Sequence, residues 1–247
     1  MLPYAFSGFP FVERFYSYAE LNSTNEKAVN FSEIPKTGVF VFQADCQNTG
    51  RGRLGRTFFS KNEGGLWVSI LKQLPDISTH FIHNRSISLA ITSSIKRFIP
   101  KASLSIKWPN DIYWNRKKIC GILLESHRTS PNALVIGFGL NVNISREEFP
   151  PELHSIATSV LQESGKTIPL STLLRTIMEF YKEYSEAPVE DCHSQYLSLL
   201  YRQNSPVTIE KTAGIFRTVS IEGSAVIETD NGFVNVNGGT MLFSEDK

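Results

Sequence analysis

Cysteine is scarce in this chain, and long apolar runs and an excess of charge of one sign are missing. The 247 residues include three cysteines far apart in the sequence, a pattern typical of reduced thiols and not of a disulfide framework. No apolar run is long enough to span a membrane, and the N-terminal stretch lacks the basic start of a signal peptide. The formal net charge of +1 gives no global attraction to nucleic acid. These absences predict a cytoplasmic globular protein without a membrane segment.

Motifs for a protein-held metal ion or a P-loop are also missing. His80 and His83 are three residues apart, but no further cysteine or histidine completes a ligand set nearby. Gly165 and Lys166 imitate the end of a phosphate-binding loop, yet the earlier glycine of that motif falls at Val160. We therefore expect neither a dedicated metal site nor a P-loop.

Strand-like and helix-like patterns alternate over most of the chain. A stripe of apolar residues from Ile87 to Phe98, stopped by Pro100, predicts one helix that faces the core. A second stripe from Leu173 to Tyr184, with Ser171 as its cap, predicts another. The apolar runs that predict strands are Val39–Ala44, Leu66–Leu71, Ser103–Lys107, Ile119–Leu124 and Leu134–Ile144.

The last part of the chain has a different texture. After Pro206 the sequence consists of short β segments, and Asp230-Asn231-Gly232 is a strong hairpin signal. We predict an α+β protein in which residues 1–204 form a domain with a mixed β-sheet and flanking helices. Residues 205–247 are predicted to form a small β-barrel-like domain.

Positive charge is concentrated in one glycine-rich segment, QNTGRGRLGR, at residues 47–56. Glycines allow the backbone to pass close to a ligand, and arginines supply forked donors for phosphate and carboxylate oxygens. A plain surface loop or a nucleic-acid contact could have the same composition. The segment has no interleaved aromatic residues and the net charge is nearly zero, which favours a loop that becomes ordered over an anionic ligand.

Two further stretches carry polar groups at the ends of predicted elements. Ser23 and Glu26 have the spacing of a capping box, so a helix is expected to begin there with its amide donors available to a polar ligand. The stretch KWPND at residues 107–111 ends a predicted strand on a turn, and Arg116-Lys117-Lys118 lies on a turn that enters the next strand. Taken alone, the first stretch is equally typical of a plain capped helix, and the second is more typical of a basic hairpin tip in solvent than of a binding site.

Together these stretches resemble the biotin–protein ligase family, also called biotin–[acetyl-CoA-carboxylase] ligases. The resemblance continues beyond the opening motifs and covers nearly the whole chain. Its pieces, in order, are STN at 23–25, GRGRLGR at 50–56, KWPND at 107–111, RKKICGILLE at 116–125 and GFGLNVN at 137–143. The resemblance implies a class II synthetase-like catalytic fold followed by a small SH3-like β-barrel.

The resemblance also implies a reaction in two steps. Biotin's carboxylate attacks the α-phosphate of ATP to give biotinyl-5′-AMP and pyrophosphate, and a lysine of a biotin carboxyl carrier domain then displaces AMP. Two anionic groups repel each other, so positive side chains must gather them and stabilise the developing charge. Mg²⁺ is expected to arrive with ATP and to keep much of its own water, without a dedicated protein cage.

Each proposed role is carried over to a residue of this sequence by the resemblance. Lys118 is expected to bridge the biotin carboxylate and the α-phosphate, and Arg53 to act with it in catalysis from the mobile loop. The residues expected to contact biotin are Ser23, Thr24, Asn25, Gln47, Arg51, Gly52, Arg53 and Lys118. Those expected to contact the nucleotide are Lys107, Asn110 and Asn141.

The sequence departs from the family pattern at two places and leaves some alternatives open. Phe58 stands where the family usually has tryptophan, and GGLW at 64–67 replaces a more common asparagine-leucine-tyrosine ending. Larger family members carry a helix-turn-helix domain, but 22 residues precede Ser23, so we expect no operator DNA binding. A lipoate–protein ligase or octanoyl transferase remains the alternative, since pocket size cannot be derived from sequence. A monomer and a homodimer both remain open.

Overall fold

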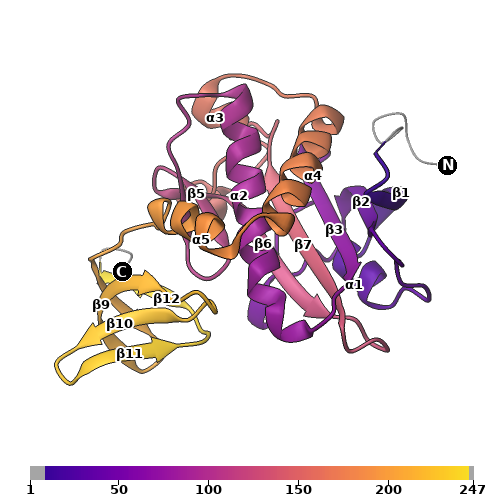
Figure 1. Ribbon diagram of the computed structural model, residues 1–247. Coiled ribbons are helices and arrows are strands. Elements are labelled where there is room, and N and C mark those ends of the chain that lie inside the picture. The colour runs from indigo at the N-terminus through magenta and orange to yellow at the C-terminus, as the bar shows by residue number, and fades with distance from the viewer. Residues whose placement is uncertain (1–8, 245–247) are drawn as a thin grey trace.

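A seven-stranded mixed sheet is the framework of the computed structural model, which describes residues 9–244 (Figure 1). Its strand order is β1-β2-β3-β7-β6-β5-β4. β1 and β2 are parallel, and all other neighbours are antiparallel. The strands are β1 (Val12–Leu21), β2 (Val39–Gln47), β3 (Gly65–Gln73), β4 (Leu104–Lys107), β5 (Asp111–Trp114), β6 (Lys117–Ser126) and β7 (Ala133–Asn141). All five predicted strands are present, and the sheet adds β1 and β5.

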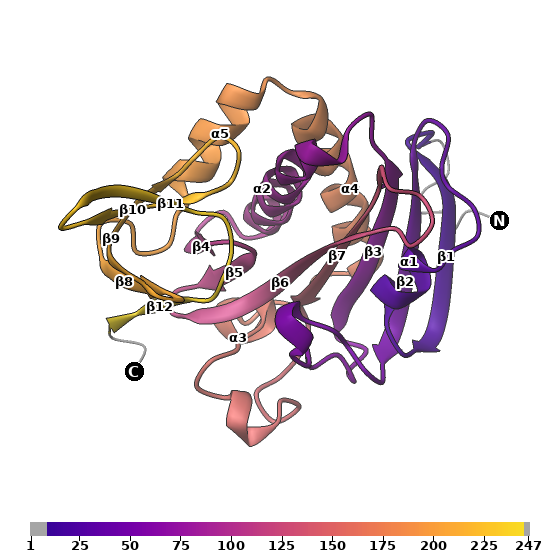
Figure 2. The ribbon, with the colours of Figure 1, turned by 90° about the horizontal axis from the view of Figure 1, so that it is seen from below.

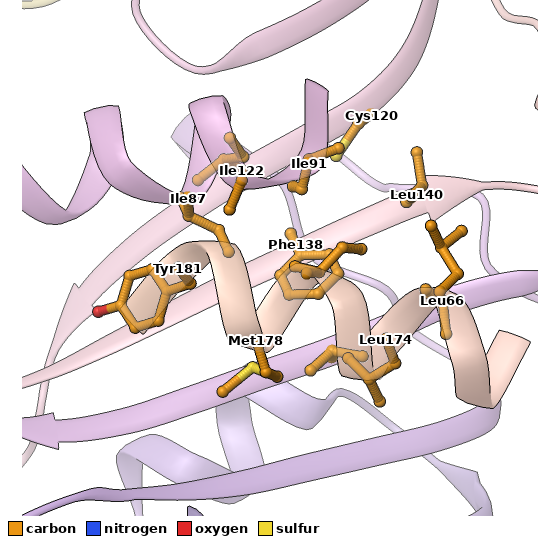
Figure 3. Packing of buried hydrophobic residues seen from close by; sticks show 14 of the residues in the cluster. Leu66, Ile87, Ile91, Cys120, Ile122, Phe138, Leu140, Leu174, Met178 and Tyr181 are labelled. Atoms are coloured by element: carbon orange, nitrogen blue, oxygen red, sulfur yellow. The ribbon is translucent and has the colours of Figure 1, made fainter. Parts of the chain in front are cut away.

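Two long helices cover one face of this sheet (Figure 2). They are α2 (His80–Phe98) and α4 (Leu170–Glu186), and both predicted helical stripes face the core. Their apolar side chains pack against alternate residues of the central strands, as Figure 3 shows for Ile87, Phe138 and Leu174. The predicted cap of the second helix was wrong: Pro169 precedes the first turn and Ser171 lies within it. Pro169 lies at the N-cap position, where its missing N–H removes no intrahelical hydrogen bond.

The shorter helices lie around the edges of this layer. They are α1 (Thr24–Val29), α3 (Val160–Ser164) and α5 (Val189–Ser198). Ala28 of α1 packs with Phe40, Leu71 and Val135, which belong to the opposite sheet face from the one that α2 and α4 cover. Ser23 caps α1 because its hydroxyl accepts from the Glu26 amide at 3.4 Å, as the capping-box spacing predicts.

The C-terminal strands form a second sheet, which is five-stranded and antiparallel (Figures 1 and 2). Its order is β11-β10-β9-β8-β12. The strands are β8 (Pro206–Ile209), β9 (Thr212–Val219), β10 (Ala225–Thr229), β11 (Gly232–Val236) and β12 (Met241–Phe243). The predicted hairpin is confirmed between β10 and β11, where Gly232 has a φ of 105° that favours glycine. Over the described residues β11 and β12 are the two edge strands of this sheet and do not pair with each other, so barrel closure stays a prediction.

A shared apolar cluster joins the two sheets. Trp108 follows β4, and it packs in one cluster with Tyr196 of α5 and with Phe216 and Ile227 of the second sheet. The Trp108 indole donates to the Gly223 carbonyl at 2.9 Å. The turn after β4 is therefore held by apolar packing and by a hydrogen bond to the second sheet domain. None of the helices formed by residues 9–244 has the length and apolar character needed to cross a membrane.

Candidate functional site

The pocket lies over a part of the sheet that consists largely of glycines. On the face opposite α2 and α4, Gly121 pairs with Gly139, and Gly137 pairs with both Leu123 and Ser69. These small residues line a pocket of about 310 Å³ or border it. A Cβ at Gly139 would lie 2.5 Å from the Phe58 ring, so the aromatic residue that departs from the family pattern covers this glycine floor.

The start of α1 and the end of β2 form one polar wall of the pocket. Thr24 donates to Gln47 Oε1 from its amide at 2.8 Å, and Gln47 Nε2 in turn donates to Ser60 at 3.0 Å. Asn25 Oδ1 accepts from Ser69 at 2.5 Å. Ser23, Thr24, Asn25 and Gln47 are all buried. Because burial restricts their rotamers, these groups are held ready for a polar ligand.

The glycine-arginine loop closes over the pocket with its arginines already bound to protein acceptors. Arg51 forms an ion pair with Glu125 at 3.3 Å. Arg53 donates to Asn110 Oδ1 at 3.2 Å and to the Gly239 carbonyl at 3.4 Å. Burial lowers the pKa of Arg53, and the nearby Asp111 carboxylate opposes this shift; a guanidinium remains charged under such conditions.

A β-bulge directs Lys118 into the pocket. Lys118 and Gly121 are three residues apart in β6, so a regular strand would point them to opposite faces. The register between β5 and β6 shifts where Ile112 pairs with Cys120 and Tyr113 pairs with Lys118, which leaves Ile119 as the extra residue. Both Lys118 and Gly121 therefore line the pocket. Bulges beside active sites commonly re-aim a side chain in this way.

Asp111 is a site residue to which the sequence analysis gave no role. It begins β5, one residue after the predicted turn, and its Oδ1 lies 2.6 Å from Lys118 Nζ. The contact is an ion pair without the angles of a directed hydrogen bond, since Oδ1 is otherwise unpartnered. Lys118 is itself in β6 and not on the predicted turn. Its Nζ also lies 5.6 Å from the centroid of the Phe58 ring.

The residues predicted to contact the nucleotide lie at the other end of the pocket. Asn110 and Lys107 line it, and the Lys107 ammonium lies 5.4 Å from each of the Tyr113 and Phe243 ring centroids. Asn141 does not line it. Asn141 is buried on the same sheet face as Gly139, where its Nδ2 donates to the Thr158 carbonyl at 3.0 Å. Its Oδ1 has no hydrogen-bond partner, so one acceptor remains for a donor group.

The pocket therefore brings together all the predicted site residues except Asn141. A residue that the sequence analysis missed supports the pocket from outside its lining. Glu125 accepts from Asn25 Nδ2 at 2.9 Å and pairs with Arg51, so it links α1 to the loop. Its only sequence signal was its place at the end of RKKICGILLE. Across residues 9–244, the structure has no group of three or more acidic, histidine or cysteine side chains able to hold a metal ion.

Comparisons with known proteins agree with this geometry. A model described as the biotin/lipoate A/B protein ligase family matches residues 16–143. The bifunctional ligase/repressor BirA of Bacillus subtilis is 36% identical over 172 residues, which are 67% of this chain and 52% of that protein. The biotin–[acetyl-CoA-carboxylase] ligase of Mycobacterium tuberculosis is 26% identical over 211 residues, 82% of this chain and 78% of that protein. The chain spans about half the length of the Bacillus relatives, 45% and 52%.

A solved structure shares the arrangement of both sheets. The biotin protein ligase from Aquifex aeolicus in complex with biotin and ATP has a TM-score of 0.81 and 25% identity, and the match covers 94% of this chain and 100% of that one. The family match begins within β1 and ends just beyond β7, so it includes every element of the pocket floor. Because that match covers more than half of the chain, this protein belongs to the biotin/lipoate A/B protein ligase family.

Proposed function

We propose that this protein is a biotin–protein ligase, which activates biotin with ATP and transfers it to a lysine of a biotin carboxyl carrier domain. The observation that carries the proposal is the charge of the pocket. Arg51, Arg53, Arg56, Lys107 and Lys118 all line it, and Asp111 is its one acidic residue among those that the structure describes. Such a pocket suits a reaction that joins a carboxylate to a phosphate.

In the first step a biotin carboxylate oxygen attacks the α-phosphorus, and the bond to the leaving pyrophosphate breaks. Lys118 exchanges its contact with Asp111 for the carboxylate and the α-phosphate oxygens, and Arg53 adds charge from the loop. The ring end of biotin lies against the buried wall of Thr24, Asn25 and Gln47, where hydroxyl and amide groups match polar ring atoms. Charge stabilisation by preorganised donors supplies much of the rate enhancement in such sites.

The nucleotide occupies the end of the pocket near Asn110 and Lys107. The contact of Asn141 with the nucleotide stays a prediction, because its unpartnered Oδ1 is buried and Asn141 does not line the pocket. Mg²⁺ would accompany ATP and neutralise phosphate charge. The donor set fits this expectation, because a hydrated Mg²⁺ bound by phosphates needs at most one or two carboxylates and Asp111 borders the pocket.

In the second step the carrier lysine attacks the acyl carbon, and AMP leaves with the electrons of the anhydride bond. The lysine must arrive as a neutral amine. Once Lys118 has turned to the substrate, Asp111 is free to accept the proton that the ammonium loses. Loop residues 50–56 exclude water, which protects the adenylate from hydrolysis.

The partner in this proposal is the carrier domain of a biotin-dependent carboxylase. We further propose that the chain acts in the cytoplasm, as its free cysteines Cys46, Cys120 and Cys192 favour. The expectation that it does not bind operator DNA is retained as a proposal.

The test is a substrate comparison. Exchange of labelled pyrophosphate into ATP is measured with biotin, lipoate or octanoate as the only added acid. The proposal predicts exchange with biotin and little with the other acids. Exchange with lipoate and none with biotin would replace it with the lipoate–protein ligase alternative. No exchange with any acid would contradict the adenylation step itself.

A further inference from the structure

The backbone of Lys118 is held by a segment that lies far from it in the sequence. β7 begins to pair with β6 at Cys120, so Lys118 lies beyond the reach of that strand. Residues 156–158 take the place of β7 there. The Lys118 amide donates to the Ile156 carbonyl at 2.9 Å, and the Thr158 amide donates to the Lys118 carbonyl at 2.9 Å. The position of Lys118 therefore depends on this short segment.

A single carboxylate fixes both the segment and the turn on the other side of Lys118. Glu163 Oε1 accepts from the Thr158 hydroxyl at 2.8 Å, and its Oε2 accepts from Asn115 Nδ2 at 2.9 Å. Thr158 is buried and Asn115 lies in the turn that joins β5 to β6, with a left-handed φ of 54°. Glu163 thus connects the two chain segments that border Lys118, one before it and one beside it.

We propose that Glu163 is a positioning residue for Lys118. This rests on the proposed function, in which Lys118 must meet two anionic groups at once. Hydrogen bonds to a carboxylate are roughly twice as strong as those between neutral groups, and both oxygens of Glu163 are used. Loss of these bonds lets residues 156–158 and the turn at Asn115 move apart. A displacement of about 1 Å at a reacting group costs on the order of a hundredfold in rate.

The rival explanation is that Glu163 only stabilises α3, since it lies in the first turn of that helix and an acidic group there is favoured by the helix dipole. If Glu163 only stabilised α3, activity would not depend on which group its side chain bonds outside the helix. The positioning role requires the particular bond to Asn115. The two explanations therefore differ in whether exchanging the partners restores activity.

The experiment uses an exchange of hydrogen-bonding partners. In Glu163→Gln one carboxylate oxygen becomes an NH₂ group, which faces the NH₂ of Asn115 or the Thr158 hydroxyl. In Asn115→Asp two carboxylates face each other. In the double variant the new amide donates to the new carboxylate, and aspartate tolerates the left-handed backbone as asparagine does. Initial rates of biotin-dependent pyrophosphate exchange are measured for each, with Glu163→Ala as the full deletion.

We expect Glu163→Ala and Asn115→Asp to lose about tenfold or more in rate, and the double variant to recover to within about threefold of the wild type. Glu148→Ala is the matched control. Glu148 accepts hydrogen bonds from Ser145 and Asn62 in the same loop region but has none to Thr158. The exchange rate of this variant should equal that of the wild type. A wild-type rate in Glu163→Ala, or a double variant no faster than Asn115→Asp alone, overturns the proposal.

Amide hydrogen exchange at Lys118 separates this inference from the proposed function, because it needs no substrate. We expect faster exchange of the Lys118 amide in Glu163→Ala, with unchanged exchange in β3 and β7. Unchanged exchange at Lys118 would also overturn the positioning role. If the wild type shows no biotin-dependent activity while Lys118 exchange rises in Glu163→Ala, the proposed function fails and the structural link from Glu163 to Lys118 survives.

Discussion

Replacing Gly137 by alanine should collapse the polar wall of the pocket. A Cβ at this position would lie 1.8 Å from Asn25 Oδ1, far inside ordinary contact distance, so the Asn25 side chain must move. It would then lose the Ser69 hydrogen bond at 2.5 Å and the Glu125 hydrogen bond at 2.9 Å. A neutral hydrogen bond contributes about 0.5–1.5 kcal/mol and one to a carboxylate about 1.5–3 kcal/mol, so the expected loss is about 2–4.5 kcal/mol.

Two measurements check this magnitude. The loss should lower the midpoint of thermal unfolding by about 4–18 °C, at roughly 2–4 °C per kcal/mol for a chain of this size. The biotin concentration for half-maximal pyrophosphate exchange should rise about tenfold or more, since 1.4 kcal/mol is a factor of ten. Gly238→Ala is the control, because its Cβ would meet nothing within 4 Å. A Gly137→Ala protein with a wild-type midpoint and a wild-type biotin requirement would refute the reasoning.

Three further changes test other parts of the account. Lys118→Ala should keep the circular dichroism spectrum and lose most pyrophosphate exchange at saturating biotin and ATP; near-normal exchange would remove Lys118 from the mechanism. Arg53→Gly should release biotinyl-5′-AMP sooner, so that lysines of added bystander proteins become biotinylated, and an adenylate retained as long as in the wild type would argue against loop closure. Burial, and after it the positive charge of Lys72, lowers the pKa of His83 to about 4. Between pH 6.5 and 4 the unfolded chain is therefore protonated at His83 while the native state is not. Stability should therefore fall as pH drops from 6.5 towards 4, by about 3 kcal/mol, and His83→Gln should flatten urea-unfolding stability over that range; an unchanged slope would contradict the assignment.

The sequence predicted those parts of the fold whose local pattern is strong. β2, β3 and β7 are buried on both faces, so each appears as a continuous apolar run. β1 was missed because it is an edge strand with mostly half-exposed or exposed residues, which leave no apolar run. β5 was missed because it has four residues directly after the turn at Asn110.

The sequence predicted the site residues that belong to a recognisable motif. It did not predict those whose direction depends on the register between strands. The wall of Thr24 and Gln47 follows from motifs alone. The bulge at Ile119, by contrast, leaves no mark in the residue pattern, yet it decides that Lys118 faces the pocket. Asp111 and Glu125 received no role because their partners are set by strand pairing and by a loop far away in the sequence. The contact of Asn141 with a nucleotide stays a prediction.

The central claim is that this pocket joins biotin to a carrier lysine through an adenylate. The most direct measurement is the intact mass of a purified biotin carboxyl carrier domain after incubation with the protein, biotin, ATP and Mg²⁺. The account predicts the addition of one biotinyl group at a single lysine, dependent on ATP and absent when Lys118→Ala replaces the wild type. An unmodified carrier with the wild type, or modification that proceeds equally well with the Lys118→Ala protein, would contradict it.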